Sequence, residues 1–156
     1  SNGVISGGVT ITYQAETDAG QEISADELNK SKAVIEKRLY AKNIYEIVEI
    51  IKSQEAYTVV SEKDYLRNVK KTGYRSYHMI VEVPVFFSDS KTPMKVEIQI
   101  RTIAMDFWAS EEHDLKYKNE NADMHEIEKE LLECANDINK IDLRMQHIRD
   151  KVYKNL

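Results

Sequence analysis

The chain has 156 residues, of which 31% are charged, and carries a formal net charge of -5 at pH 7. This length suffices for one domain with its own hydrophobic core, and the acidic balance gives no global reason to expect a nucleic-acid substrate or a membrane as partner. The single cysteine, Cys134, excludes an intrachain disulfide and a cysteine-rich zinc site, and no apolar run has the roughly 18 to 20 residues that span a bilayer, so we expect a soluble chain from a reducing compartment.

The N-terminal part of the chain differs in composition from the rest, because four of the five glycines lie in the first 20 residues. We therefore divide the chain into an atypical segment, residues 1–42, and a domain, residues 43–156. Within the segment, Val9–Tyr13 has the composition of a strand. Ser24–Glu27 fits a capping box, which predicts a helix that ends near Leu39.

The middle of the chain predicts one short helix and a β-hairpin. Apolar residues at i, i+3, i+4 and i+7 predict a helix with one buried stripe, formed by Ile44, Ile47, Val48 and Ile51. Ala56–Val60 is a candidate buried strand. Met79–Phe87 and Lys95–Thr102 alternate in character on either side of a turn, which indicates an antiparallel hairpin. Pro84 has no amide donor, so we expect a sheet edge or a bulge there.

Two helices are predicted after the hairpin, the first over Thr102–Lys118. The second follows from apolar residues that recur at alternating intervals of 3 and 4, a heptad seam made of Met124, Ile127, Leu131, Cys134, Ile138, Ile141, Met145, Ile148 and Val152. Such a seam packs either on its own chain or against a second copy, and the sequence leaves both open. Because Cys134 lies on the seam, we expect it to be a buried small hydrophobe.

The strand Lys95–Thr102 carries polar residues on one face, where apolar neighbours hold Glu97, Gln99 and Arg101 in a rigid row. The preceding segment, Lys63–His78, is rich in cations, namely Lys63, Arg67, Lys70, Lys71 and Arg75. Cations beside a tight turn with a tyrosine suit a polyphosphate that carries a flat base. A half-exposed strand and a solvated basic loop would show the same patterns, so composition alone does not decide between them.

Three strings of residues resemble the synthetase domain of the small alarmone synthetases, the short members of the RelA/SpoT family. They are GYRSYH (Gly73–His78), VEIQIRT (Val96–Thr102) and AMDFWASEEHDLKYK (Ala104–Lys118), in the order and spacing of that family. The resemblance extends from about Asn43 to the C-terminus. It implies a nucleotidyltransferase-like α/β fold, with a mixed, largely antiparallel sheet of four or five strands, flanking helices and a long C-terminal helix.

The resemblance also implies a function, the cytoplasmic synthesis of ppGpp and pppGpp by transfer of pyrophosphate from ATP to the 3'-hydroxyl of GTP or GDP, with Mg²⁺ and commonly in a homotetramer. It makes Glu97 the acid of the reaction centre, which takes up the hydroxyl proton or holds Mg²⁺. It implies that Tyr74 stacks on guanine, Gln99 reads the base or ribose, and Ala109 lets guanine approach closely. The residues implied at the phosphates are Lys70 and His78, with Arg75 and Arg101 as cationic supports.

Three departures from the family pattern bear on this function. Val69–Thr72 replaces Pro-Lys-Pro-Asn, so the preset shape of the loop and one base contact are in question. Glu111 replaces an apolar residue, and we expect it at the surface or paired, because a buried carboxylate is costly. Residues 1–55 match neither the family's ATP-clasping segment nor its strand Asp-Ile-Ala-Gly-Ile-Arg, whose aspartate binds Mg²⁺. The second metal carboxylate is therefore not identified.

Residues 7–39 weakly resemble the beginning of the extracytoplasmic region of SecD, a membrane subunit of the protein-export machinery. Two alternatives to an active synthetase therefore stay open. One is a catalytically incomplete module that binds guanine nucleotides. The other is a fusion that carries an export-machinery fragment.

Overall fold

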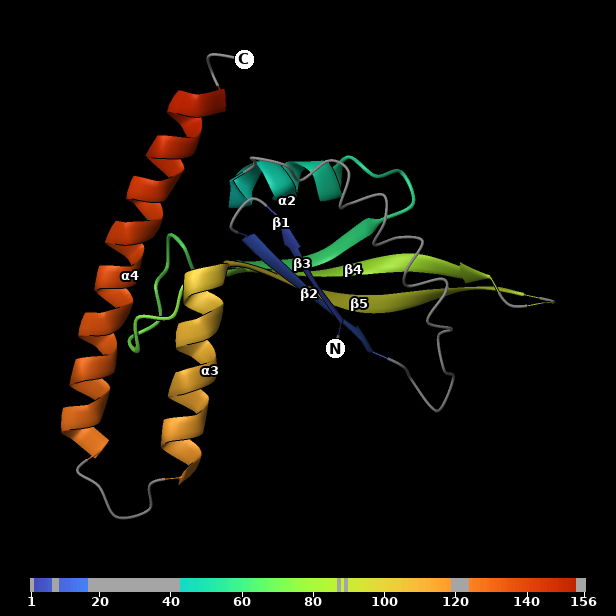
Figure 1. Cartoon of the computed structure of the whole chain (residues 1–156). Coiled ribbons are helices and arrows are strands. Elements are labelled where there is room, and N and C mark those ends of the chain that lie inside the picture. Colours follow the sequence, from blue (N-terminus) through green and yellow to red (C-terminus); the bar gives the residue numbers. More distant parts are fainter. Residues whose placement is uncertain are drawn as a thin grey trace.

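The computed structural model describes residues 2–6, 9–16, 43–86, 88, 90–118 and 124–153. The elements in chain order are β1 (Asn2–Ser6), β2 (Val9–Glu16), α2 (Ile44–Lys52), β3 (Thr58–Asp64), β4 (Tyr77–Phe86), β5 (Lys91–Thr102), α3 (Ile103–Lys118) and α4 (Met124–Tyr153). The strands form one sheet in the order β1-β2-β5-β4-β3, and neighbouring strands pair antiparallel. Helix α2 covers one face of the sheet, while α3 and α4 extend from its end as an antiparallel pair (Figure 1). The predicted α/β fold with a largely antiparallel sheet is confirmed.

The helix α2 begins at a reciprocal cap and buries the predicted stripe. The Asn43 side chain accepts from the amide of Glu46 at 2.9 Å, and the Glu46 carboxylate accepts from the amide of Asn43 at 3.1 Å. The stripe packs on the apolar face of β4 and β5, and the resulting core contains Ile44, Ile47, Val48, Ile51, Tyr77, Met79, Val81, Val96, Ile98 and Ile100. Since side chains alternate along a strand, the polar residues between them lie on the opposite face of the sheet.

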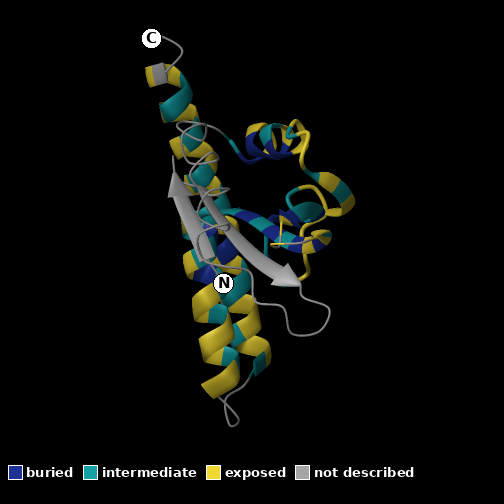
Figure 2. Ribbon diagram, turned by 90° about the vertical axis from the view of Figure 1, so that its right-hand side faces the viewer, coloured by how far each residue is buried: buried dark blue, intermediate teal, exposed yellow. Residues whose placement is uncertain are grey.

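A second core lies where α3 meets α4, as Figure 2 shows by the buried residues there. It contains Met105, Trp108 and Ala135, each at most 2% exposed. The Trp108 indole donates to the carbonyl of Leu131 at 2.9 Å, so the tryptophan both fills the interface and fixes its register. Trp108 therefore serves packing between α3 and α4.

The strands differ from the predictions mainly at their ends. β3 begins two residues later than expected and has an irregularity between Val59 and Ser61. The expectation of a buried strand is wrong, because most residues of β3 are exposed and none is buried. Pro84 lies on an inner strand, but the last β3–β4 pair is Thr58 with Glu82, so only β5 flanks the proline. The β-strand predicted at Val9–Tyr13 is present as β2 and pairs along β5. The helix predicted to end near Leu39 lies outside the described residues.

The expectation that Cys134 is buried is wrong, because the thiol is exposed. The helix α4 contacts α3 and the loop before β4 through Leu131, Ala135 and Ile138, so the buried stripe passes through position 135. A straight α-helix has 3.6 residues per turn and drifts away from a seam of period 3.5. None of the helices in the described residues is both long and apolar enough to cross a bilayer.

Candidate functional site

The polar face of β4 and β5 brings together residues that the sequence predicts for the site. His78 pairs with Gln99 across the two strands, and its Nδ1 lies 3.4 Å from Oε1 of Glu97. Arg101 donates to the Gln99 side-chain oxygen at 3.2 Å. The four side chains are half-buried, so they stand on a rigid surface that a ligand can still reach.

Tyr74 joins this group from the loop between β3 and β4. Its hydroxyl lies 3.1 Å from His78 Nε2, and Arg101 donates to the hydroxyl oxygen at 3.3 Å. One continuous chain of contacts therefore runs from Tyr74 through His78 to Glu97. The tyrosine and the acid lie on the same side of the sheet, as the sequence predicts.

The protonation of His78 follows from its surroundings. Burial lowers the pKa of His78 below its usual value, the neighbouring Glu97 opposes this shift, and the cations Lys70 and Arg101 add to it. A neutral imidazole with its hydrogen on Nδ1 can accept a hydrogen bond from the Tyr74 hydroxyl at Nε2 and donate one to Glu97. This arrangement places a neutral donor beside the Glu97 carboxyl group.

Gly73 gives the loop the conformation that places Tyr74. Its φ of +91° is in the region that glycine adopts readily, and its amide donates to the carbonyl of Lys70 at 2.8 Å. A Cβ at this position would lie 2.6 Å from Cβ of Ala135. The glycine thus allows the loop to touch α4.

Arg75 connects the same loop to α4. Its guanidinium donates to the carbonyls of Gly73 at 2.9 Å and Ala135 at 3.4 Å, and to the side-chain oxygen of Asn136 at 3.0 Å. Arg75 therefore braces the loop against the helix in this structure. Its predicted contact with a phosphate stays a prediction.

Lys70 and Tyr65 complete the loop side of the site. The ammonium of Lys70 lies 4.6 Å from the ring centroid of Tyr65 and 5.0 Å from that of Tyr74. Sequence reasoning missed Tyr65. The signal that could have found it is alternation, because Asp64 pairs with Tyr77 on the α2 face and the next residue turns to the His78 face.

An open depression of about 350 Å³ adjoins these residues, lined by Arg101, Asp106, Ala109, Ser110, Glu111, His113 and Asp114. Arg101 Nε lies 3.0 Å from the carboxylate of Asp106, which sequence reasoning did not assign to the site. Ala109, predicted to lie close to a base, faces this space. Glu111 is exposed, as predicted.

Comparison with known proteins shows the family of this chain. The family model described as the region found in RelA / SpoT proteins matches residues 31–122. The chain belongs to the RelA/SpoT family. The curated protein GTP pyrophosphokinase YwaC of Bacillus subtilis is 42% identical over 113 residues, which are 72% of this chain and 54% of YwaC. This member of the RelA/SpoT family thus spans about half the length of the curated relatives it matches.

Solved structures share the fold of this RelA/SpoT-family chain. Small alarmone synthetase 2 from Bacillus subtilis has a TM-score of 0.66 at 30% identity, with 90% of this chain and 81% of that chain covered. Small alarmone synthetase 1 from the same bacterium, bound to its product pppGpp, has a TM-score of 0.62 at 27% identity, with 91% and 78% covered. The antiparallel sheet and its helices are therefore those of the small alarmone synthetases.

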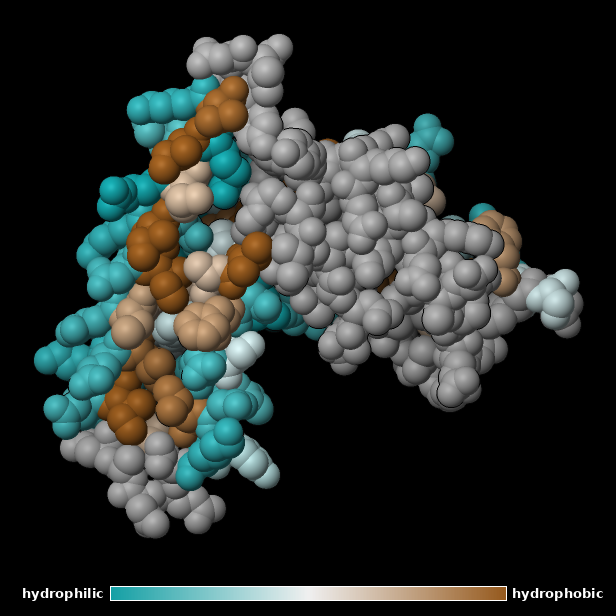
Figure 3. Space-filling model, viewed as in Figure 1, coloured by the Kyte–Doolittle hydropathy of each residue, from teal (hydrophilic) through white to brown (hydrophobic). Residues whose placement is uncertain are grey.

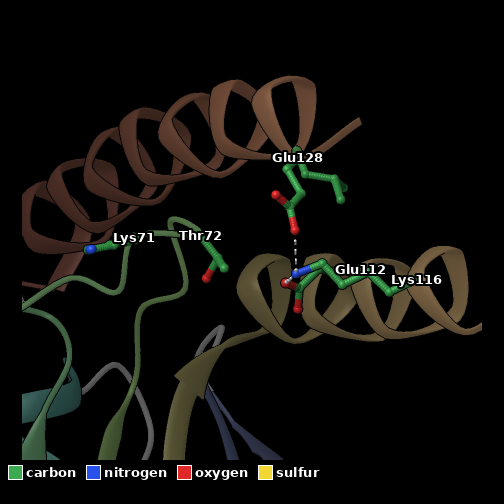
Figure 4. Close-up of a pocket in the computed structure, with 6 residues that line it drawn as sticks. Lys71, Thr72, Glu112, Lys116 and Glu128 are labelled. Carbon is green, nitrogen blue, oxygen red and sulfur yellow. Dashed lines mark hydrogen bonds and ion pairs between the residues drawn. The ribbon is translucent and has the colours of Figure 1, made fainter. Parts of the chain in front are cut away.

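The segment that departs from the RelA/SpoT pattern lies next to a second, smaller cavity of about 130 Å³ (Figure 4). Lys71 and Thr72 line it from the loop. Lys116 of α3 reaches Glu112 at 2.8 Å and Glu128 of α4 at 3.6 Å. These contacts pair Lys116 with both acids of the cavity and join the two helices.

Glu97 is the carboxylate that fits a metal ion at the strand face of this RelA/SpoT-family site. Within the described residues, no group of three or more His, Cys, Asp or Glu side chains could hold a metal ion. Mg²⁺ is commonly bound by one or two carboxylates together with substrate phosphates, and Glu97 fits that pattern. On the neighbouring strand β2, Gln14 pairs with Glu97, and the single acid of that strand, Glu16, pairs with Lys95.

Proposed function

We propose that this RelA/SpoT-family chain synthesises (p)ppGpp by transferring pyrophosphate from ATP to the 3'-hydroxyl of GTP or GDP. The observation that carries the proposal is the continuous contact from Tyr74 through His78 to Glu97 on two rigid strands. The similarity to proteins named GTP pyrophosphokinase supports the same activity. A small alarmone synthetase of this fold is bound to pppGpp.

Each side chain at the site has a role in this proposal. Glu97 takes up the proton of the 3'-hydroxyl or binds Mg²⁺, Tyr74 stacks on the guanine base, and Gln99 contacts the base or ribose. Lys70 and His78 face the acceptor phosphates, Arg75 and Arg101 support them, and Ala109 leaves room for the base. Positioning and charge neutralisation supply most of the rate enhancement. Mg²⁺, when bound at Glu97, neutralises phosphate charge.

We also propose that the protein works in the cytoplasm as a homo-oligomer, most simply a homotetramer. The support for association is the exposed half of the α4 seam, which Figure 3 shows within the apolar band along the helix. Its members Ile141, Met145, Ile148 and Val152 are 47–54% exposed. A second copy of the chain would cover them.

A second candidate function is binding of guanine nucleotides without turnover. The observation that favours it is the pairing of Gln14 with Glu97, since the described part of β2 places no carboxylate opposite the catalytic acid.

The fusion alternative is supported by the weak similarity of residues 7–39 to SecD. Sequencing the source locus tests it, and one uninterrupted natural reading frame would count against a fusion.

The activity is tested by incubating the protein with ATP, GTP and Mg²⁺ and measuring pppGpp by anion-exchange chromatography. Glu97→Gln should reduce the rate by about a hundredfold or more, because it removes the acid that assists proton transfer. GTP binding, measured by calorimetry, should persist. The control Glu49→Gln, at an exposed position of α2, should leave both unchanged.

Three results would contradict parts of this proposal. If wild-type protein binds GTP but forms no product, the binding module is the correct function. Full activity of Glu97→Gln would show that Glu97 is not the acid of the reaction centre. If wild-type protein binds neither nucleotide, both candidate functions fail.

A further inference from the structure

Tyr65 lies beside three residues of the candidate site without belonging to the set that the family resemblance assigns. Its ring centroid is 4.6 Å from the Lys70 ammonium and 5.2 Å from the His78 ring, which it meets edge to face. The Tyr74 ring lies 6.3 Å away. Tyr65 and Tyr74 therefore form two aromatic walls beside one flexible cation, and His78 packs edge to face on Tyr65.

The backbone holds Tyr65 firmly at this place. Its amide donates to the carbonyl of Ser76 at 2.9 Å, next to the paired residues Asp64 and Tyr77. The Asp64 carboxylate accepts from the amides of Leu66 at 2.9 Å and Arg67 at 3.0 Å, which closes the turn after Tyr65. A residue whose backbone is fixed in this way can position a mobile neighbour.

Lys70 is the mobile neighbour, because its side chain is exposed and has four rotatable bonds. An ammonium over the face of a tyrosine ring is attracted by the ring quadrupole. Two rings at 4.6 and 5.0 Å restrict where the ammonium can go. The restriction keeps the positive charge beside Tyr74, where a stacked nucleotide would bring its phosphates.

We propose that Tyr65 is a positioning residue that holds the Lys70 ammonium ready for the phosphates of the bound guanine nucleotide. The inference rests on the proposed function, since it assumes that Tyr74 binds the base and Lys70 the phosphates. It goes further than the proposed function in one respect. The Tyr65 ring would raise the affinity of the protein for the phosphates and not for the base, without touching the nucleotide. The effect of Tyr65 is therefore specific to the charged part of the ligand.

The test compares the binding of GTP and of guanosine, which lacks phosphates, to the full chain by calorimetry. Tyr65→Leu removes the ring and should weaken GTP about two- to fivefold, the size of one cation–π contact at a partly exposed site, while guanosine affinity stays the same. Tyr65→Phe keeps the ring face and should retain wild-type affinity for both. The control Tyr117→Leu, on α3 at a position 83% exposed, should change neither.

A double-mutant cycle with Lys70 separates positioning from general damage to the loop. In a Lys70→Met background, Tyr65→Leu should cause no further loss of GTP affinity, because the charge it positions is gone. Equal weakening of GTP and guanosine, or additive losses in the cycle, would overturn the inference. If wild-type protein makes pppGpp while Tyr65→Leu binds GTP normally, the inference fails and the proposed function stands. If wild-type protein does not bind GTP, the proposed function itself fails.

Discussion

Gly73 is the residue on which the shape of the nucleotide loop depends most directly. Replacement by alanine would force a side chain into the +91° φ region and place its Cβ 2.6 Å from Ala135. We expect Gly73→Ala to lower the free energy of unfolding by about 1–3 kcal/mol, measured by urea denaturation. The double variant Gly73→Ala/Ala135→Gly should recover only the part caused by the clash. A single variant as stable as wild type would contradict this account.

At the scale of residues, the sequence predicts the strand side of the site better than the loop side. Glu97, Gln99 and Arg101 could be placed together because a period of two fixes which side chains share a face. The hydrogen bonds from Arg75 to α4 could not be predicted, because its partner Asn136 is 61 positions further along the chain. Alternation along β3 indicates the face on which Tyr65 lies, but the contacts of its ring with Lys70 and Tyr74 depend on the three-dimensional course of the loop.

Thr102 joins two elements through one hydroxyl, at the point where β5 ends and α3 begins. The oxygen accepts from the amide of Met105 at 3.1 Å, as a helix cap does, and donates to the carboxylate of Asp142 on α4 at 2.5 Å. Thr102→Val should lower the free energy of unfolding at pH 7 by about 1–3 kcal/mol, since a cap is lost and a half-buried carboxylate loses a donor. Thr102→Ser, which keeps the hydroxyl, should lose much less.

The pH dependence of this variant gives an independent check. Burial raises the pKa of Asp142, so its charged form is a cost to the folded state above the folded pKa, and this cost disappears as pH falls through that pKa. The difference in unfolding free energy between Thr102→Val and wild type should therefore shrink in acid. A difference that is constant from pH 7 to about pH 4 would show that the loss comes from the cap alone.

At the scale of elements, the sequence predicts helices and the hairpin well and strand ends poorly. Periodicity gives α2 and the β4–β5 hairpin, because one apolar face of each is buried. It does not give β1, because its five residues, NGVIS, contain two adjacent apolar residues and no alternation. Periodicity also predicts α4, but it places Cys134 in the buried stripe where the structure has Ala135. A heptad pattern cannot show where a straight helix drifts out of contact with its neighbour.

At the scale of the whole molecule, α4 extends beyond the surface that α3 and the loop can cover. The exposed half of its seam is continuous with the half that packs within the chain. If a second copy covers it, Ile148→Asp should raise the dissociation constant of the oligomer at least about tenfold, because an unpaired carboxylate would be buried. Sedimentation velocity over a range of concentrations measures this shift.

The matched control for this test is on the same helix. Leu143 is 63% exposed but lies outside the seam, so Leu143→Asp adds the same charge without touching the proposed interface. It should sediment as wild type. A wild-type protein that sediments as a monomer at every concentration, or equal effects of the two variants, would refute association through the seam.

The contact of the loop with α4 limits how this site can be moved between proteins. Gly73, Tyr74 and Arg75 follow one another in the chain, yet the shape they share depends on a carbonyl and an amide 60 and 61 positions later. A transplant of the tyrosine loop into another scaffold would lose its form unless the supporting turn of α4 came with it. The loop and this turn of α4 therefore form one structural unit. During evolution, a substitution in one part would require a compensating substitution in the other.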